Sequence, residues 1–380
     1  MRRMAIVLGD MDLLRPLGLA GVACAVVARR SSAVRHSRFT ARIIEWTADE
    51  HELVERLCRF ARALAEPPVL YFEHDQHVLM LANHRSKLES CMRFALPEGD
   101  LAHQLIDKIQ FLDLAQRHRL PVPRTTVLDP RSGTITDPVG RFPAVIKPAT
   151  RADRGWLQVS ANGKAVGVRD ENELRELIPK LQRYGLPVLL QEEVPGHEDR
   201  IESYHAYVDQ AGAVAAEFTG RKIRTFPARY GHSTALTTTD EADVRSLGRA
   251  ILRAIGFRGV AKVDFKRSSS GDLVLLEINP RFSLWHHIGA IAGVNIPKFV
   301  WCDLVGEPRP VATKARAGVT WSNRMDLRAA RANGVPLLEW LRWTLRCDTR
   351  SGLAADDILP VVRYLAGRLG PVAGERDSAH

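Results

Sequence analysis

The most distinctive pattern in the chain is a pair of short apolar runs on either side of a polar turn. Residues 260–265 and 273–278 are largely apolar, and residues 268–271 between them read Ser-Ser-Ser-Gly. Two apolar runs that flank a Ser/Gly cluster predict an antiparallel β-hairpin. In that hairpin Asp264 and Glu277, which interrupt the apolar runs, lie on neighbouring strands.

The polar side chains of this predicted hairpin suggest a cation site. Glu277 and Asn279 point to the same face because side chains alternate along a strand. With Asp264 they supply oxygen ligands, which Mg²⁺ prefers together with phosphate oxygens. Arg281 adds a positive charge two residues further on. The alternative is a hairpin with ordinary surface acids, but these acids interrupt runs of buried character, where an unpaired carboxylate is costly.

The N-terminal part of the chain alternates between strand and helix patterns. Apolar runs at 4–8, 23–27 and 69–72 predict strands, and apolar residues have helical spacing around 13–19 and 53–64. This alternation predicts an α/β domain with a parallel sheet. Because the region lacks a GxGxxG motif, we do not expect it to bind a dinucleotide.

Further elements are predicted along the rest of the chain. Asp170 is a suitable N-cap for the helix that follows it. After Pro308 the chain is rich in Arg and Leu, contains Trp321, Trp340 and Trp343, and is expected to be mostly helical. The pattern predicts helices at 103–118, 171–184 and 240–255, a loop at 129–141, and strands at 142–148, 188–196, 201–208 and 213–219.

Composition narrows the class of protein. A chain of 380 residues, 45% of them hydrophobic, is long enough for two or three lobes with cores of their own. The apolar stretch 17–28 is too short to span a bilayer, and Asp10 and Asp12 interrupt the apolar N-terminus too early for a signal peptide. Five scattered cysteines without CxxC spacing favour a cytoplasmic protein and argue against a zinc site.

The net charge of +10 raises the question of nucleic-acid binding. No nucleic-acid motif accompanies the charge, and aromatic residues are not interleaved with the basic runs. We therefore do not expect a nucleic-acid partner. A positive field also suits a protein that handles ATP and an acidic substrate.

Several charged residues near strand ends suggest an anion site. Lys147 ends an apolar strand, where it either reaches a phosphate or extends to solvent. Lys108 is either a second phosphate ligand or a solvated helix lysine. Lys222 and Arg224 alternate onto one face, which suits an anionic substrate, although an edge strand protected by cations has the same pattern.

The order of these parts resembles the ATP-grasp superfamily over about residues 100–310. The order is Lys108, then Lys147 in FPAVIKP, then QEEVPG, FTGRKIR, VDF and EINPR. Within the superfamily, HEDRIESYHAYVDQAG and FTGRKIRTFPARYGHST look most like the predicted carboxylate–amine ligases, which are similar to D-aspartate ligase or to carbamoyl phosphate synthetase. The resemblance implies a mixed α/β (α+β) ATP-grasp fold with an N-terminal Rossmann-like domain.

The resemblance also implies a role for each candidate residue. Metal ligands for one or two Mg²⁺ ions, with Mn²⁺ as an alternative, are Asp264, Glu277 and Asn279. Residues that stabilise the reacting centre are Arg281, Lys222 and Arg224. Residues that bind ATP are Lys108 and Lys147 at the phosphates, Gln191, Glu192, Glu193 and Val194 at adenine through the main chain, and Glu198 at the ribose.

The family chemistry sets the expected function. A carboxylate is activated as an acylphosphate with release of ADP, and an amine then attacks it, so the expected partners are small-molecule carboxylate and amine substrates. Two alternatives remain, a kinase that phosphorylates a small acceptor and a catalytically inactive nucleotide-binding regulator. A homodimer is also left open.

One segment departs from the family pattern. The loop 149–160, where the family is rich in glycine, contains only Gly155, although backbone N–H groups can still hold phosphate there.

The resemblance also implies a division of the chain into four parts. They are an N-terminal domain at 1–98, a linker helix and lid subdomain at 99–190, a large subdomain with the metal site at 191–310, and a basic, Trp-containing helical extension at 311–380.

Overall fold

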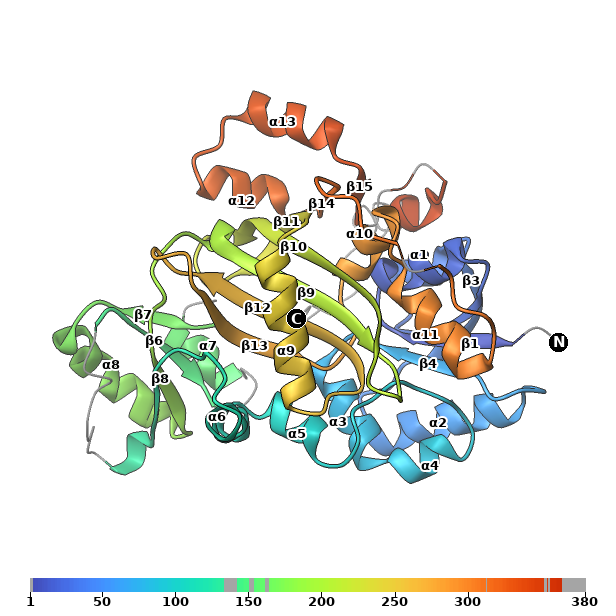
Figure 1. Ribbon diagram of the computed structural model, residues 1–380, viewed down its shortest axis with the longest axis horizontal. Coiled ribbons are helices and arrows are strands. Elements are labelled where there is room, and N and C mark those ends of the chain that lie inside the picture. Colours follow the sequence, from blue (N-terminus) through green and yellow to red (C-terminus); the bar gives the residue numbers. More distant parts are fainter. Residues whose placement is uncertain are drawn as a thin grey trace.

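The chain folds around three β-sheets with helices packed on their faces (Figure 1). The computed structural model describes residues 3–132, 142–149, 154–160, 164–311, 313–351, 354 and 356–363. Figure 1 shows the N-terminal sheet at the right, the largest sheet in the centre and the smallest sheet at the left.

The N-terminal sheet is parallel and has the order β3-β2-β1-β4, as the alternating pattern predicts. The edge strand β3 escaped prediction because only one of its six residues is buried. The strands are β1 (Met4–Leu8), β2 (Ala23–Ala28), β3 (Thr40–Glu45) and β4 (Val69–Phe72). The helices are α1 (Met11–Leu19), η1 (Ala33–His36), α2 (Glu50–Arg62), α3 (Asp75–Asn83) and α4 (Arg85–Glu89).

Two helices, and not one, connect this domain to the small sheet. They are α5 (Leu101–Ile106) and α6 (Lys108–Arg117), so the prediction of a single helix at 103–118 is wrong. Asp107 has an extended backbone, and its side chain accepts hydrogen bonds of 2.9 Å from the N–H groups of Ile109 and Gln110. Such an N-cap starts a new helix and makes Lys108 its first residue.

The small sheet has the antiparallel order β5-β8-β6-β7 and forms a subdomain that we call the lid. Its strands are β5 (Thr125–Leu128), β6 (Ala144–Pro148), β7 (Val166–Val168) and β8 (Val188–Glu192). Its helices are η2 (Pro130–Ser132), α7 (Arg154–Ser160) and α8 (Glu171–Tyr184). As predicted, Asp170 caps α8, because its carboxylate accepts bonds from the N–H groups of Asn172 and Glu173.

The segment predicted as the loop 149–160 is partly a helix. Residues 154–160 form α7, and Trp156 from this helix is completely buried in the lid core. Burial of a large aromatic side chain explains why these residues are helical rather than extended in a loop. Residues 150–153, and residues 133–141 of the other predicted loop, lie outside the described part of the chain.

The largest sheet has the order β13-β12-β9-β10-β11-β14-β15 and contains the predicted hairpin as β12 and β13. Its strands are β9 (Ile201–Val208), β10 (Val214–Phe226), β11 (His232–Thr239), β12 (Gly259–Arg267), β13 (Leu273–Asn279), β14 (Thr320–Ser322) and β15 (Thr349–Arg350). The helices around it are η3 (Glu198–Arg200), α9 (Ala242–Ala254), α10 (Trp285–Ile291), α11 (Ile296–Val305), α12 (Asp326–Ala332) and α13 (Leu337–Arg346).

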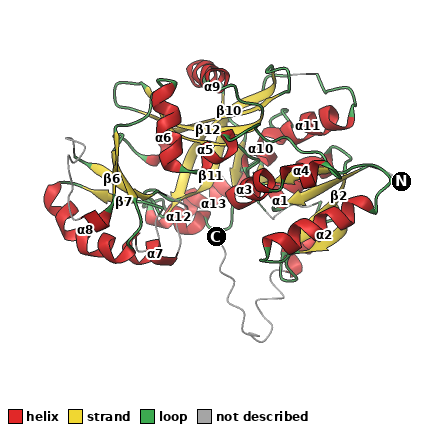
Figure 2. Ribbon diagram, turned by 90° about the horizontal axis from the view of Figure 1, so that it is seen from below, coloured by secondary structure: helices red, strands yellow, loops and turns green. Residues whose placement is uncertain are grey.

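The two faces of this sheet pack against different layers (Figure 2). One face, with Tyr204 and Phe265, packs on α9. The other face, with Phe218, packs on Trp285 of α10 and, through α10 and α11, on the N-terminal domain. This second face carries the candidate site where the apolar packing ends.

The C-terminal part contains strands as well as the predicted helices. Strand β14 pairs with β11, and β15 pairs with β14, so this part extends the large sheet. Trp321 of β14 is 1% exposed and donates its indole N–H to Asp12 of α1, at 2.9 Å. The division of the chain at residues 98, 190 and 310 stays a prediction.

A search for membrane-spanning helices covered the described ranges. In them, no single helix has the length and apolar character needed to cross a membrane. The bent pair of α10 and α11 meets those criteria only jointly.

Candidate active site

The candidate site lies on the face of the large sheet that turns from apolar to charged along β12. On that face, successive side chains of the strand are Val260, Lys262, Asp264 and Lys266. Val260 belongs to the buried core against α10 and α11. The three charged residues that follow therefore lie where the core opens towards the lid.

Asp264 and Glu277 face each other directly across β12 and β13, as the hairpin pattern predicts. The Asp264 side chain is 3% exposed, and its two oxygens accept hydrogen bonds from Ser203 Oγ, at 2.5 Å, and from the Lys262 ammonium group. Buried carboxylates need such donors. Glu277 is exposed and acts electrostatically on Lys147 of the lid.

Glu277 and Asn279 lie together, since the Asn279 amide donates to Glu277 Oε1 at 3.1 Å. Partial shielding from water by the surrounding protein raises the pKa of Glu277, but the ammonium groups of Lys262 and Lys164 outweigh this effect and hold the pKa well below its usual range. Glu277 is therefore ionised, as a metal ligand must be.

Arg281 lies beside this group, as predicted. Its Nη2 donates to Asn279 Oδ1 at 3.1 Å, and its Nε pairs with Asp75 at the start of α3. The next residue, Phe282, donates its N–H to the carbonyl of Phe72 at the end of β4, at 3.2 Å. The site thus meets the carboxyl ends of the N-terminal parallel strands, where open α/β sheets bind ligands.

The two predicted phosphate lysines are close to each other and to Glu277. The pKa of Lys108 is lowered to about 8, first by burial and then by the charge of Lys147. Burial likewise lowers the pKa of Lys147, while Glu277 and Glu198 oppose the change. Lys147 Nζ donates to Gln191 Oε1 and Lys108 Nζ donates to the carbonyl of Pro148, both at 2.8 Å.

The predicted adenine segment is partly engaged within the lid. The N–H groups of Glu192 and Glu193 donate to the carbonyls of Arg124 and Pro143, at 2.8 and 3.0 Å. These two N–H groups are thus paired within the lid, because lid pairing continues past the end of β8. We place adenine recognition at the main chain of Val194 as a prediction.

Glu198 faces the same region from η3. Its carboxylate is 3.8 Å from Lys266 Nζ, and it acts electrostatically on Lys147. Glu198 is thus brought together with the lysine that was predicted to contact phosphate.

Lys222 and Arg224 do not share a face, contrary to the prediction from alternation. The pairing of β10 with β11 shifts at this point, so Lys222 pairs with Leu236 while Arg224 pairs with the adjacent Ala235. A β-bulge of this kind reverses the side-chain direction. Lys222 acts electrostatically on Glu277, so it faces the site.

Arg224 is instead held by the C-terminal part of the chain. Its guanidinium donates to both carboxylate oxygens of Asp326, at 2.9 and 2.6 Å. It also lies 4.2 Å from the ring centre of Trp343. The structure does not bring Arg224 together with the predicted metal ligands, and its catalytic role stays a prediction.

Four residues of the site escaped the sequence prediction. Lys262 was treated as part of an apolar strand and Lys266 was not considered, although Lys-x-Asp-x-Lys places three charges on one face of β12. Ser203 comes from β9 and Lys164 from the bend before β7, and no local pattern links them to the hairpin. Only strand pairing and lid packing bring these two residues to Glu277 and Asp264.

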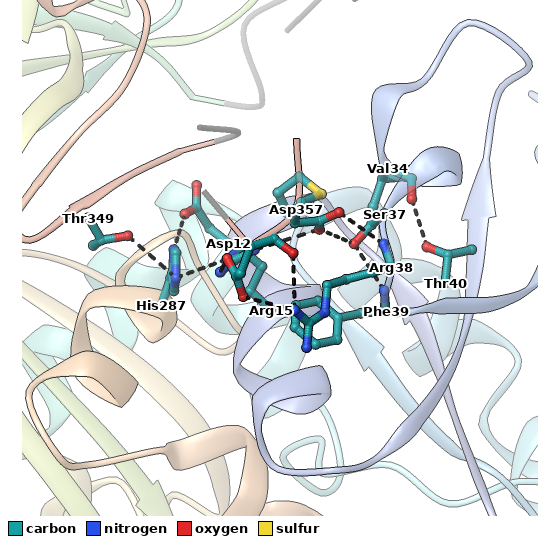
Figure 3. Close-up of polar contacts among 12 residues, drawn as sticks. Asp12, Arg15, Val34, Ser37, Arg38, Phe39, Thr40, His287, Thr349 and Asp357 are labelled. Atoms are coloured by element: carbon teal, nitrogen blue, oxygen red, sulfur yellow. Dashed lines mark hydrogen bonds and ion pairs between the residues drawn. The ribbon is translucent and has the colours of Figure 1, made fainter. Parts of the chain in front are cut away.

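His286 and His287 lie in the first turn of α10 and are buried. His287 Nδ1 lies 3.0 Å from Asp12 Oδ1, and Arg15 Nε donates to His287 Nε2 at 3.3 Å (Figure 3). Asp357 pairs with Arg15 in the same cluster. The cluster joins α1, α10 and the C-terminal part, so these contacts of His287 connect parts of the fold.

The donor set of the site fits Mg²⁺. Two carboxylates and an amide oxygen are hard ligands, and Mg²⁺ completes its shell with phosphate and water oxygens. Among the described residues, no three His, Cys, Asp or Glu side chains cluster as a metal site. The predicted set has two carboxylates, and a bound nucleotide is needed to complete it.

The chain is similar to several known proteins. Residues 207–325 match the model of a family described as ATP-grasp in the biosynthetic pathway with Ter operon. The chain is 23% identical over 276 residues to D-aspartate ligase of Enterococcus faecium, covering 68% of this chain and 66% of that protein. It is 26% identical over 214 residues to D-alanine–D-alanine ligase of Halorhodospira halophila, covering 53% and 66%. The matches thus span just under two thirds of each relative.

Solved structures show the same fold at low sequence identity. N5-carboxyaminoimidazole synthetase from Staphylococcus aureus, complexed with ADP, superposes with a TM-score of 0.62 at 14% identity, covering 84% of this chain and 80% of that one. L-amino acid ligase from Bacillus licheniformis gives a TM-score of 0.60 at 14% identity, covering 81% and 75%. The chain therefore has the ATP-grasp fold, and residues 207–325 match an ATP-grasp family model.

Proposed function

We propose that this protein is an ATP-dependent ligase that activates a carboxylate as an acylphosphate, with release of ADP, and joins it to an amine. The observation that carries the proposal is the direct pairing of Asp264 with Glu277 in reach of lysines from both sheets. The similarity to proteins named D-aspartate ligase and D-alanine–D-alanine ligase supports the same chemistry.

The lid lysines are suited to hold the phosphates of ATP. Lys147 is fixed by Gln191, and Lys108 is fixed at the start of α6 by the carbonyl of Pro148. Both ammonium groups are desolvated, which strengthens their attraction to a phosphate oxygen. Glu198 is placed to accept hydrogen bonds from ribose hydroxyls, and Val194 to meet the adenine edge.

The hairpin residues are suited to the transfer step. When held by Asp264, Glu277 and Asn279, Mg²⁺ supplies positive charge to the phosphate oxygens. Lys222 and Arg281 stabilise negative charge on the acylphosphate and on the tetrahedral centre that forms when the amine attacks. Closure of the lid over the cleft keeps water from hydrolysing the acylphosphate.

The direct test measures nucleotide turnover with Mg·ATP and pooled carboxylates, with and without pooled amines, and separates ADP from AMP. We expect ADP only when both pools are present, and fractionation of the pools then identifies the substrates. ADP with a single pool would favour phosphoryl transfer to a stable acceptor. AMP would contradict the acylphosphate mechanism.

The metal assignment has its own test in Glu277→Gln, which removes one charge with little change of shape. We expect turnover to be lost because the phosphoryl group loses its metal, while the circular dichroism spectrum and binding of ADP without Mg²⁺ persist. The matched control is Glu176→Gln, at an exposed position of α8, which should retain full activity. Full activity of Glu277→Gln would remove the carboxylate from the metal site.

A further inference from the structure

Helix α13 carries an unusual concentration of exposed leucines. None of its ten residues is buried, and Leu337, Leu338, Leu341 and Leu345 are exposed by 51%, 68%, 40% and 77%. Their spacing places all four on one side of the helix. An apolar face of this kind on a short surface helix marks an interaction site rather than a core contact.

The opposite side of α13 is held firmly, so the leucine face has a fixed direction. Trp340 donates its indole N–H to Asp326 Oδ2 at 3.0 Å, and the Trp343 ring lies under the Arg224 guanidinium. Asp326 is 1% exposed. Figure 1 shows α13 at the upper edge of the molecule, above α12. The leucines therefore point away from the body of the protein.

Positive charge borders the leucine face. Arg342 and Arg346 are exposed and follow Leu338 and Leu345 around the helix, and the adjacent α12 adds the exposed Arg328 and Arg331. An apolar stripe flanked by arginines is the composition of helices that lie in the headgroup region of anionic bilayers.

A second copy of the chain fits this surface poorly. A ten-residue helix is about 15 Å long and about 10 Å wide, so two such faces would bury about 300 Å² in total. Stable interfaces bury about 1,200 Å² or more. A twofold contact would also bring Arg342 and Arg346 close to their own copies.

We propose that α13 is an interfacial helix that docks the protein reversibly on an anionic lipid surface. The leucines enter the boundary between headgroups and acyl chains, and Arg342 and Arg346 contact lipid phosphates. The docking uses no residue of the candidate active site, so it stands independently of the proposed ligase activity.

The test is sedimentation of the full chain with phosphatidylcholine vesicles, with and without phosphatidylglycerol. We expect binding only to the anionic vesicles, weakening as salt is raised. Leu345→Glu should lower the partition coefficient about tenfold, equivalent to about 1.4 kcal/mol. Leu19→Glu, which changes a leucine 49% exposed on another helix, should bind like the unmodified chain.

Three results would overturn the proposal. They are absence of binding to anionic vesicles, equal binding of Leu345→Glu, and a concentration-dependent dimer in sedimentation equilibrium that Leu345→Glu dissociates. Thermal unfolding of Leu345→Glu should match that of the unmodified chain, because the side chain is 77% exposed. This comparison separates loss of docking from loss of folding.

Discussion

The buried ion pair between Arg224 and Asp326 gives the sharpest stability prediction. Asp326 accepts four hydrogen bonds, two from Arg224, one from Thr234 Oγ1 at 2.9 Å and one from Trp340. Asp326→Ala removes the counter-charge of the Arg224 guanidinium, and the Arg224 side chain is only 10% exposed. Breaking one side of such a pair costs about 3–5 kcal/mol.

The expected loss can be converted into a melting temperature. With an unfolding entropy of about 2.1 cal/mol/K per residue, the whole chain has about 0.8 kcal/mol/K, so about 4 kcal/mol lowers the melting temperature by about 5 °C. Differential scanning fluorimetry measures this shift. Asp348→Ala is the matched control, because this carboxylate is exposed and bonds to Thr320, and its loss should cost about 1 kcal/mol or less.

A double variant shows whether the cost comes from the unpaired charge. Arg224→Leu combined with Asp326→Ala removes both charges, so it should be more stable than Asp326→Ala alone. If the double variant is at least as unstable as the sum of the two single ones, the argument from an unpaired buried charge fails. A shift below about 1 °C for Asp326→Ala would refute it as well.

Two further predictions concern nucleotide binding. Lys108 must be protonated to attract phosphate, and its pKa is about 8. The affinity for ATP should therefore fall as pH rises through about 8, by up to about tenfold per pH unit. Calorimetric titration at several pH values checks this, and the affinity of Lys108→Met should depend less steeply on pH. Lys266→Met should raise KM for ATP several-fold with little change in kcat, since Lys266 lies beside Glu198, which is predicted to bind the ribose. An equally large fall in kcat would contradict this placement of Lys266.

The parts of the fold that sequence predicts well are those in which local signals agree. Helix α8 has an N-cap aspartate, helical spacing and a glycine at its end, and its predicted bounds match the structure. The β12–β13 hairpin has two apolar runs and a polar turn. In both cases a segment of about 20 residues contains all the signals for the element, so no distant contact is needed to recognise it.

The failures occur where one residue changes direction or where distant segments meet. A capping aspartate divides α5 from α6, and a β-bulge separates Lys222 from Arg224, although helical and strand spacing continue through both points. The partners of Arg281 and Asp264, which are Asp75 and Ser203, come from other elements. Periodicity carries no information on such contacts, so the order of the motifs indicates the site but not its complete membership.

The charge balance of the site links the lid to the hairpin. Six lysines interact there with four carboxylates; the lysines are Lys108, Lys147, Lys164, Lys222, Lys262 and Lys266, and the carboxylates are Asp75, Glu198, Asp264 and Glu277. Burial and mutual repulsion lower the pKa values of the lid lysines, so this surplus of positive charge opposes closure of the cleft. A bound triphosphate reverses the balance, because each lysine gains a counter-charge. Nucleotide binding and closure of the lid are therefore expected to favour each other, which protects an acylphosphate from water only when ATP has been bound.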